Sequence, residues 1–180
     1  MGRCVDLWEI MGYYTQSRGK KGIGRVGYTD FTSEFNYSVD AKHRVNIPSR
    51  FRKIMAEKNV SEVVISKGID SNHIDVYPLP KWIALRDKIT SSMQLVNRTH
   101  RNFLRQFTQN AAHCTLDSQG RIMLTPKLME MAGIKDNGNV TIIGMIDFME
   151  IWDPDELSKH EENTPLTDKD FEKLEQLPLI

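Results

Sequence analysis

The sequence predicts an α+β fold in which two similar half-domains share one core. Three observations lead to this prediction. An Asp-x-x-x-Arg pattern occurs at residues 40–44 and again, 77 positions later, at residues 117–121. Each pattern is followed by a short strand-like alternation, a proline that opens a helical pattern, and two more strand-like segments. Because each copy is only about half as long as a typical domain, we expect the two copies to build one core together.

The correspondence between the copies continues beyond the Asp-to-Arg pattern. At the same offset of 77 positions, Val63 matches Val140. The offset then falls by two, so that residues 74–78 match residues 149–153, as a turn shortened by two residues would produce. A single Asp-x-x-x-Arg pattern carries almost no information, whereas two at matched spacing indicate an internal duplication.

The elements of the first copy follow from its periodicity. Apolar and polar residues alternate in half-buried strands, whereas helical spacing brings apolar residues back every three or four positions. Proline is well tolerated in the first turn of a helix, which fits Pro48. The expected elements are a strand at 35–39, a turn at 40–44, a strand at 45–47, a helix at 48–55, and strands at 63–65 and 74–77. The second copy repeats this order from Cys114 to Trp152.

A helical connector is expected between the two copies. Trp82, Leu85 and Ile89 share one face of it, and Phe103 and Phe107 share another. Three arginines, Arg98, Arg101 and Arg105, form a separate stripe. Like charges at this spacing repel one another on an isolated helix, so a compensating partner is expected. A DNA backbone, an acidic face of a neighbouring subunit and a merely solvated surface all remain open.

The expected segments of the chain differ in composition. Residues 1–30 read as a flexible basic leader, either an arm that reaches DNA or, as we favour, a mis-started or added extension. After position 153 the pattern Asp-Pro-Asp-Glu predicts a capped helix start. The segments are the leader at 1–30, a first repeat at 31–80, a helical connector at 81–111, a second repeat at 112–155 and an acidic helical tail at 156–180.

Charge is segregated along a chain whose formal net charge is zero. Residues 40–58 contain six cations and two acids, whereas residues 150–180 contain ten acids and three lysines. This distribution argues against a uniformly basic nucleic-acid binder but permits one anion-facing side. The two cysteines, Cys4 and Cys114, do not suggest a disulfide framework or a zinc site. Without a long apolar run or a signal-peptide pattern, we expect no membrane association and a cytoplasmic location.

The Asp-x-x-x-Arg turn has two possible roles. The aspartate can accept backbone N–H groups within the turn. The arginine can then fold back onto that carboxylate as a structural staple, or it can project towards phosphate oxygens or a guanine edge. Exposed turn salt bridges are common, so geometry alone favours the staple. The neighbouring cations Lys42, Arg50 and Arg52 are not required by a staple and shift the balance towards DNA.

These residues resemble a known family. Residues 40–52, residues 117–122 and the closing residues 148–152 resemble MraZ, a bacterial regulator with two SpoVT/AbrB-like repeats, over about 31–160 of this chain. The resemblance implies a swapped-hairpin β-barrel built from two β-β-α-β-β repeats. It also implies rings that bind direct repeats upstream of the division and cell-wall gene cluster. His43 departs from the family pattern, which usually has glycine there, and this matters if the position requires a positive φ.

The resemblance and the turn chemistry together define the expected DNA-binding residues. Arg44 and Arg121 are expected to contact base edges or phosphates, and Asp40 and Asp117 to shape the turns. The more basic first turn is expected to contribute more affinity than the second. The full set is Asp40, Lys42, His43, Arg44, Arg50, Arg52, Asp117, Ser118, Gln119, Arg121 and Lys127.

An enzyme is not expected. His100, His113 and His160 lack the spaced Cys, Asp or Glu partners of a metal site, and no phosphate-binding loop follows a strand. We therefore expect no cofactor, no metal and no small-molecule substrate. The expected partners are double-stranded DNA, at the nucleoid, and further copies of this chain. The alternative is an AbrB-like protein-interaction or antitoxin-type module that has no operator of its own.

Overall fold

The computed structural model describes residues 30–69, 71–93 and 96–175. The leader predicted at 1–30 therefore lies, apart from Asp30, outside the described residues, as do the last five residues of the predicted tail. The described residues form a mixed α+β structure with antiparallel strands, which confirms the α+β part of the predicted fold class.

In the described part of the chain, eight strands form two antiparallel sheets. The larger sheet has six strands in the order β1-β7-β8-β4-β3-β5, and β2 pairs with β6 in a separate two-stranded ribbon. Their bounds are β1 Glu34–Ser38, β2 Arg44–Asn46, β3 Glu62–Lys67, β4 Ile74–Pro78, β5 Ala112–Thr115, β6 Arg121–Met123, β7 Asn139–Met145 and β8 Phe148–Trp152. The order of strands along the chain is the predicted one, and β2 begins and ends one residue earlier than predicted.

Six helices complete the described part of the chain: α2 Ser49–Glu57, α3 Leu79–Ser91, α4 Arg98–Thr108, α5 Pro126–Met131, α6 Pro154–Asn163 and α7 Asp168–Glu175. Pro48 is the N-cap residue of α2 rather than part of its first turn. At the equivalent place Thr125 caps α5 by accepting a hydrogen bond from the Leu128 amide. Asp153 caps α6 as predicted, by accepting the amides of Asp155 and Glu156.

The pairing of the strands relates the two repeats by a pseudo-two-fold axis. In the ribbon, Val45 of β2 lies opposite Ile122 of β6, and these residues are equivalents in the duplication. In the larger sheet, Asp75 of β4 lies opposite Glu150 of β8, and these residues are equivalents at the shortened offset. Equivalent residues can face each other in antiparallel strands only where the symmetry axis passes between them. The axis therefore passes through both pairs.

The remaining pairings interleave the repeats. Tyr37 of β1 lies opposite Val140 of β7, and the equivalent contact places Cys114 of β5 opposite Val63 of β3. The outer strand of each repeat thus pairs with a strand of the other repeat. Neither half completes its sheet alone, in agreement with the expectation that the two copies build one core together.

One hydrophobic core lies between the sheets and the two short helices. Phe51 and Ile54 of α2 and Leu128 of α5 are fully buried in it, together with apolar residues from strands of both repeats. The Phe51 ring packs edge-on against the rings of Phe31 and Phe35, with centroid distances of 5.1 and 5.2 Å. This shared core holds the ribbon and both Asp-to-Arg turns in fixed positions.

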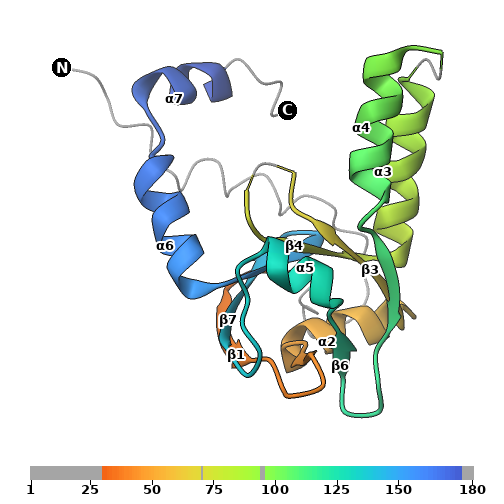
Figure 1. Ribbon diagram of the computed structural model, residues 1–180, viewed down its shortest axis with the longest axis vertical. Coiled ribbons are helices and arrows are strands. Elements are labelled where there is room, and N and C mark those ends of the chain that lie inside the picture. Colours follow the sequence, from red (N-terminus) through yellow and green to blue (C-terminus); the bar gives the residue numbers. More distant parts are fainter. Residues whose placement is uncertain (1–29, 70, 94–95, 176–180) are drawn as a thin grey trace, which may run out of the picture.

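The connector forms a helical hairpin with its own smaller core. Trp82 of α3 stacks on Phe107 of α4 at a centroid distance of 4.9 Å, and both pack near Tyr77 and Val64 of the sheet. Phe103 is 38% exposed, so it contributes only at the edge of this cluster. The hairpin projects from the body, and its tip points away from the end that carries the β2–β6 ribbon (Figure 1). Among the described helices, none has the length and apolar character needed to cross a bilayer.

Candidate nucleic-acid interface

The first turn, residues 40–44, is closed by its aspartate. Asp40 Oδ1 accepts the backbone amides of Lys42 and Arg44 at 2.8 and 3.0 Å. Asp40 Oδ2 accepts the Arg44 side chain, with Nε at 2.8 Å and a terminal nitrogen at 2.7 Å. His43 occupies the left-handed region with φ of 59°. This is the positive φ that glycine, the usual residue of the family pattern at this position, adopts more easily than histidine.

The second turn, residues 117–121, repeats this geometry. Asp117 Oδ1 accepts the amides of Gln119 and Arg121 at 2.9 and 3.0 Å. Asp117 Oδ2 accepts Arg121 Nε at 2.9 Å and lies 2.8 Å from a terminal nitrogen of the same arginine. Gly120, with φ of 76°, stands where His43 stands in the first turn. Both turns therefore contain the Asp–Arg staple, one of the two roles that the sequence left open for this pattern.

The staples hold both aspartates in the charged form. The hydrogen bond from the Arg44 side chain is the main cause of the strongly lowered pKa of Asp40. The backbone amide of Arg121, followed by its side chain, lowers the pKa of Asp117 to about 2. Each carboxylate orients a guanidinium but uses only two of its five N–H donors, from Nε and one terminal nitrogen. The staple fixes the orientation of the guanidinium but does not bond to its remaining N–H donors.

The β2–β6 ribbon joins the two turns. Val45 and Ile122 point into the core and are fully buried, so the alternating positions on both strands face outward. On that outer face Arg44 lies opposite Met123, and Asn46 lies opposite Arg121. The two turns are also close enough for Arg121 to approach Asp40, with 3.7 Å between its terminal nitrogen and Oδ2. The ribbon thus presents four side chains in two cross-strand pairs.

The remaining predicted residues fall into three groups. Lys42, Ser118, Gln119 and Lys127 are exposed. His43 is held by Asp136 of the second repeat, with 3.0 Å between Nε2 and Oδ1.

The last group contains two arginines of α2 that bond away from the first turn. Arg52 donates from Nε to the Ile47 carbonyl at 3.1 Å and reaches the Gln119 carbonyl of the second turn at 3.4 Å. Arg50 donates to the Thr32 hydroxyl at 3.0 Å. Cations that are close in the sequence are therefore divided in space: Lys42 and Arg44 lie in the first turn, Arg52 reaches the second turn, and Arg50 bonds to Thr32 just before β1.

Sequence reasoning missed three residues of this surface. Asn46 and Met123 were not singled out, although each lies two positions after a staple arginine and so shares its face of the strand. This alternation is visible in the sequence. Asp136, the partner of His43, gave no signal because it lies in a loop of the other repeat.

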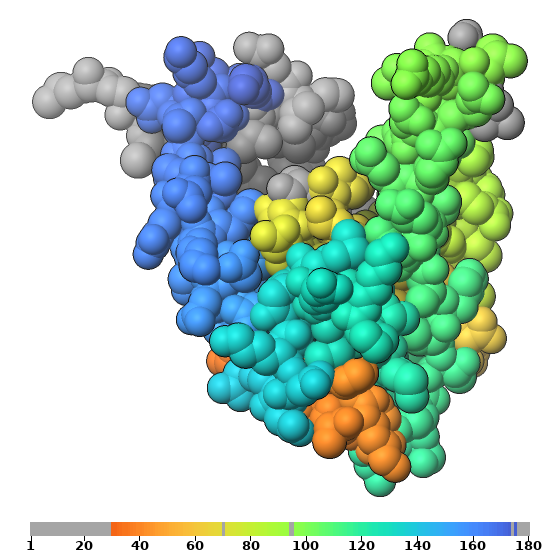
Figure 2. Space-filling view, in the orientation of Figure 1, coloured from red at the N-terminus to blue at the C-terminus, as the bar shows by residue number. Residues whose placement is uncertain are grey.

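The turns and the acidic tail lie at different ends of the molecule. Both turns emerge at the lower end in Figure 1, while α6 and α7 rise towards the opposite end. The space-filling view shows residues of the first turn and of the second turn side by side at the lower tip (Figure 2). The turn-bearing surface is therefore separated from most of the acidic residues of α6 and α7, as required of a surface that binds an anion.

Comparisons with known proteins agree with this architecture. A family model described as "MraZ protein, putative antitoxin-like" matches the chain twice, over residues 31–106 and 107–176. A protein of Alkaliphilus metalliredigens named transcriptional regulator MraZ is 34% identical over 148 residues, which cover 82% of this chain and 98% of the relative. Proteins of the same name from Clostridium tetani and Acetivibrio thermocellus are 31% and 39% identical, over 82% and 68% of this chain and 98% and 80% of the respective relatives.

Proposed function

Because the chain belongs to the MraZ family, we propose that it is a transcription regulator that binds double-stranded DNA through the β2–β6 ribbon and its two turns. The observation that carries this proposal is the repeated staple. Two aspartates hold two arginines at neighbouring positions, related by the pseudo-two-fold axis, on the outward face of the ribbon, where both arginine side chains are partly exposed. The exposed Lys42 of the first turn and the exposed Lys127 after the second turn add positive charge that rigid turns do not need.

The dimensions and chemistry of the ribbon suit the major groove. A two-stranded antiparallel ribbon fits this groove, and arginine and asparagine are the side chains that make bidentate contacts to guanine and adenine edges. We assign sequence readout to Arg44, Asn46 and Arg121, and phosphate contacts to the exposed Lys42 and Lys127. In this proposal Arg52 acts indirectly, by holding the second turn.

Affinity is proposed to come from assembly. One ribbon contacts few phosphates, whereas an oligomeric ring presents several ribbons, so that each further contact with a direct repeat becomes intramolecular. The operator would be a set of direct repeats upstream of the division and cell-wall gene cluster, and the protein would act at the nucleoid. The interleaved pairing of the repeats also supports, for each subunit, the swapped-hairpin barrel of this family.

The arginine stripe of α4 fits the assembly better than the operator. Arg98, Arg101 and Arg105 are exposed, and the described residues give them no ion pair. They lie on the hairpin that projects away from the turns, so one subunit would not place the stripe and the ribbon on the same stretch of DNA (Figure 1). We propose that the stripe faces acidic residues of a neighbouring subunit.

The test is DNA binding by a charge-reversed turn. We expect wild-type protein to bind a fluorescent duplex from its own upstream region, with affinity that falls steeply as salt rises because counterions are released. Arg44→Glu should abolish this binding and leave the mass by light scattering unchanged, at several times 20.8 kDa. Unchanged binding by this variant would overturn the assignment of the interface.

A matched control separates a local effect from a general change of charge. Arg86→Glu makes the same reversal on α3, where Arg86 is exposed and pairs with its neighbour Asp87, and it should bind DNA as the wild type does. The antitoxin-like description of the family favours one rival, a protein-interaction module. Wild-type protein that is monomeric or dimeric and does not bind its upstream DNA would support that rival.

A further inference from the structure

A buried polar cluster lies on the pseudo-two-fold axis, at the opposite side of the core from the ribbon. His73 and Asp75 are each 3% exposed, and the Glu150 side chain is 15% exposed. Asp75 and Glu150 lie directly opposite each other on β4 and β8. Like charges at such a position repel, and burial increases the cost of both. The duplication places these two carboxylates side by side, so a positively charged group is needed to offset their negative charge.

The imidazole in this cluster comes from one repeat only. His73 Nε2 lies 3.1 Å from Asp75 Oδ1 and 3.7 Å from Glu150 Oε1. At the equivalent position the second repeat has Phe148, so one imidazole serves both acids. Gly68 makes room for this ring, because a Cβ there would lie 2.3 Å from two of its atoms.

The two carboxylates are oriented by aromatic donors from the same duplication. The Tyr77 hydroxyl donates to Asp75 Oδ2 at 2.8 Å, and the Trp152 indole N–H donates to Glu150 Oε2 at 2.8 Å. Tyr77 and Trp152 are themselves equivalents in the two repeats. Each donor occupies one oxygen and leaves the other directed at His73. Outer hydrogen bonds of this kind fix the ligands of metal ions in proteins.

The atoms of His73, Asp75 and Glu150 that face one another, two of which share the hydrogen bond between His73 and Asp75, lie at distances that fit a small divalent ion. His73 Nε2, Asp75 Oδ1 and Glu150 Oε1 all lie within 4.8 Å of one another. A tetrahedral zinc ion with bonds of about 2.1 Å separates its ligand atoms by about 3.4 Å. The observed separations of 3.1 and 3.7 Å lie on either side of this value. Small side-chain adjustments would therefore complete three ligand positions.

We propose that His73, Asp75 and Glu150 bind one divalent transition-metal ion, of the Zn²⁺ class, between β4 and β8. One imidazole nitrogen and two carboxylate oxygens are ligands that Zn²⁺ accepts. A divalent cation neutralises both carboxylates, whereas a protonated imidazole neutralises only one. Because β4 belongs to the first repeat and β8 to the second, the ion joins the two repeats at their axis. This site is independent of the DNA-binding surface.

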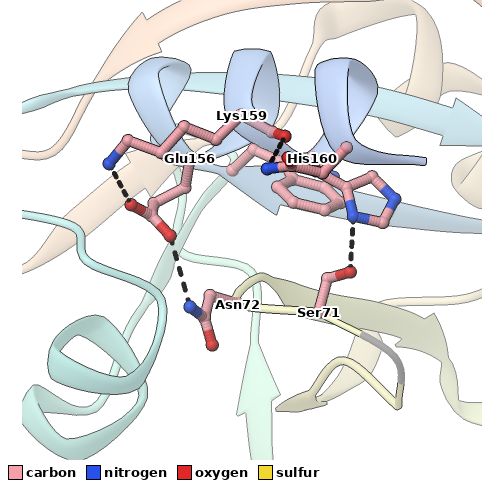
Figure 3. Close-up of a pocket in the computed structure, with 7 residues that line it drawn as sticks. Ser71, Asn72, Glu156, Lys159 and His160 are labelled. Atoms are coloured by element: carbon pink, nitrogen blue, oxygen red, sulfur yellow. Dashed lines mark hydrogen bonds and ion pairs between the residues drawn. The ribbon is translucent and has the colours of Figure 1, made fainter. Parts of the chain in front are cut away.

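His160 lies outside the cluster, beside the same tryptophan, and serves as a matched control. Trp152 lies between His73 and His160, with ring-centroid distances of 4.3 and 5.1 Å. His160 instead lines a neighbouring pocket of about 350 Å³, where its Nδ1 lies 2.7 Å from the Ser71 hydroxyl (Figure 3). Its removal disturbs the same tryptophan but takes no ligand from the proposed site.

The test is Zn²⁺ binding by untagged, chelator-stripped full-length protein in isothermal titration calorimetry. We expect one high-affinity Zn²⁺ per chain, a higher melting temperature with Zn²⁺, and a Co²⁺ absorption spectrum without thiolate bands. His73→Gln and Glu150→Gln should each weaken binding by at least about tenfold. Gly68→Ala, which displaces the imidazole without removing a ligand, should weaken it too.

The contrary outcomes are equally definite. His160→Gln should bind Zn²⁺ as the wild type does, and an equal loss in this control would place the ion elsewhere. Wild-type protein without such binding, or His73→Gln and Glu150→Gln with unchanged binding, would overturn the proposal. Since Glu150 lies at the edge of the cluster, its variant provides the answer if His73→Gln does not fold by circular dichroism.

Discussion

The turn at 40–44 and the turn at 117–121 close with hydrogen bonds that match one for one, yet different side chains hold them in the molecule. The first is tied down by its own residue His43, which contacts Asp136 in the second repeat. The second is tied down by Arg52, which reaches from α2 of the first repeat to the Gln119 carbonyl. Each turn is thus held by a residue from the opposite repeat.

The difference follows from the left-handed residue in each turn. Gly120 adopts φ of 76° without strain and has no side chain, and the space beside it is filled by Arg52. His43 adopts φ of 59° at some cost and offsets this through a contact that glycine cannot make. The two turns therefore adopt the same left-handed backbone conformation in different ways: the second turn has a residue without a side chain, and the first has a side chain with a stabilising partner.

The largest expected effect is on DNA affinity, and it tests whether the turns are functionally equal. Arg44→Ala should weaken operator binding by about tenfold or more, because an arginine–base contact is worth ~1–3 kcal/mol. Arg121→Ala should cost less, since Arg121 is less exposed and also approaches Asp40. Fluorescence anisotropy at one salt concentration measures both. Equal losses would show that the turns are equivalent, and unchanged mass by light scattering is the control.

The next effect is on stability and separates the two left-handed residues. Gly120→Ala should reduce the free energy of unfolding by ~1–3 kcal/mol, because alanine is strained at this φ. Its Cβ would also lie 2.2 Å from Arg52 Cδ. His43→Gly should change stability much less, since relief of strain offsets the lost contact with Asp136. Urea unfolding measures both variants.

A double variant separates strain from collision at Gly120. In the Arg52→Ala background, Gly120→Ala should lose the steric part of its cost and keep the part due to φ. A cost that is the same in both backgrounds would mean that Arg52 moves aside freely and does not hold the second turn.

A smaller effect tests the staple itself. Asp40→Asn removes a negative charge from a surface proposed to meet DNA, so simple electrostatics predicts tighter binding. We expect weaker binding, by several-fold, because Arg44 loses its charged partner and its orientation. Asp87→Asn is the matched control, since it removes an exposed negative charge on α3, away from both turns, and it should leave affinity unchanged or raise it slightly. Tighter binding by Asp40→Asn would show that the staple does not prepare Arg44 for DNA.

The duplication made much of this architecture predictable from the sequence. The offset of 77 positions, and its fall by two, identified residues as equivalents, and the observed strand pairs agree with these equivalences. Periodicity also located the connector helices and the inward faces of Trp82 and Phe107. These features depend on local patterns that repeat, and repetition makes weak signals reliable.

Long-range contacts of charged side chains were not predictable in the same way. Arg50 and Arg52 are close to the first turn in the sequence, but helical geometry points them to Thr32 and to the second turn. The cluster of His73 with two acids escaped notice because its members are brought together by β4–β8 pairing rather than by spacing. The sequence of a duplicated chain shows which residues are equivalent more readily than it shows where a long side chain points.

The smallest expected effect is a change of melting temperature with acid pH, which compares the stability contributed by the two staples. Unfolded aspartate has a pKa of about 3.9, and folding lowers the pKa of Asp117 to about 2 and that of Asp40 further. A lowered folded pKa means that the charged aspartate stabilises the protein above the unfolded pKa and that this contribution is lost as pH falls through the folded pKa. Asp117→Asn should therefore lower the melting temperature slightly at pH 7, and its difference from wild type should shrink between about pH 4 and pH 2.

The difference for Asp40→Asn should persist to lower pH, because Arg44 holds that carboxylate more strongly. Both effects are small because about a third of each aspartate side chain is open to solvent, which screens the charge. Identical profiles in thermal melts across this range would mean that the two staples are energetically equal, despite the different side chains that surround them.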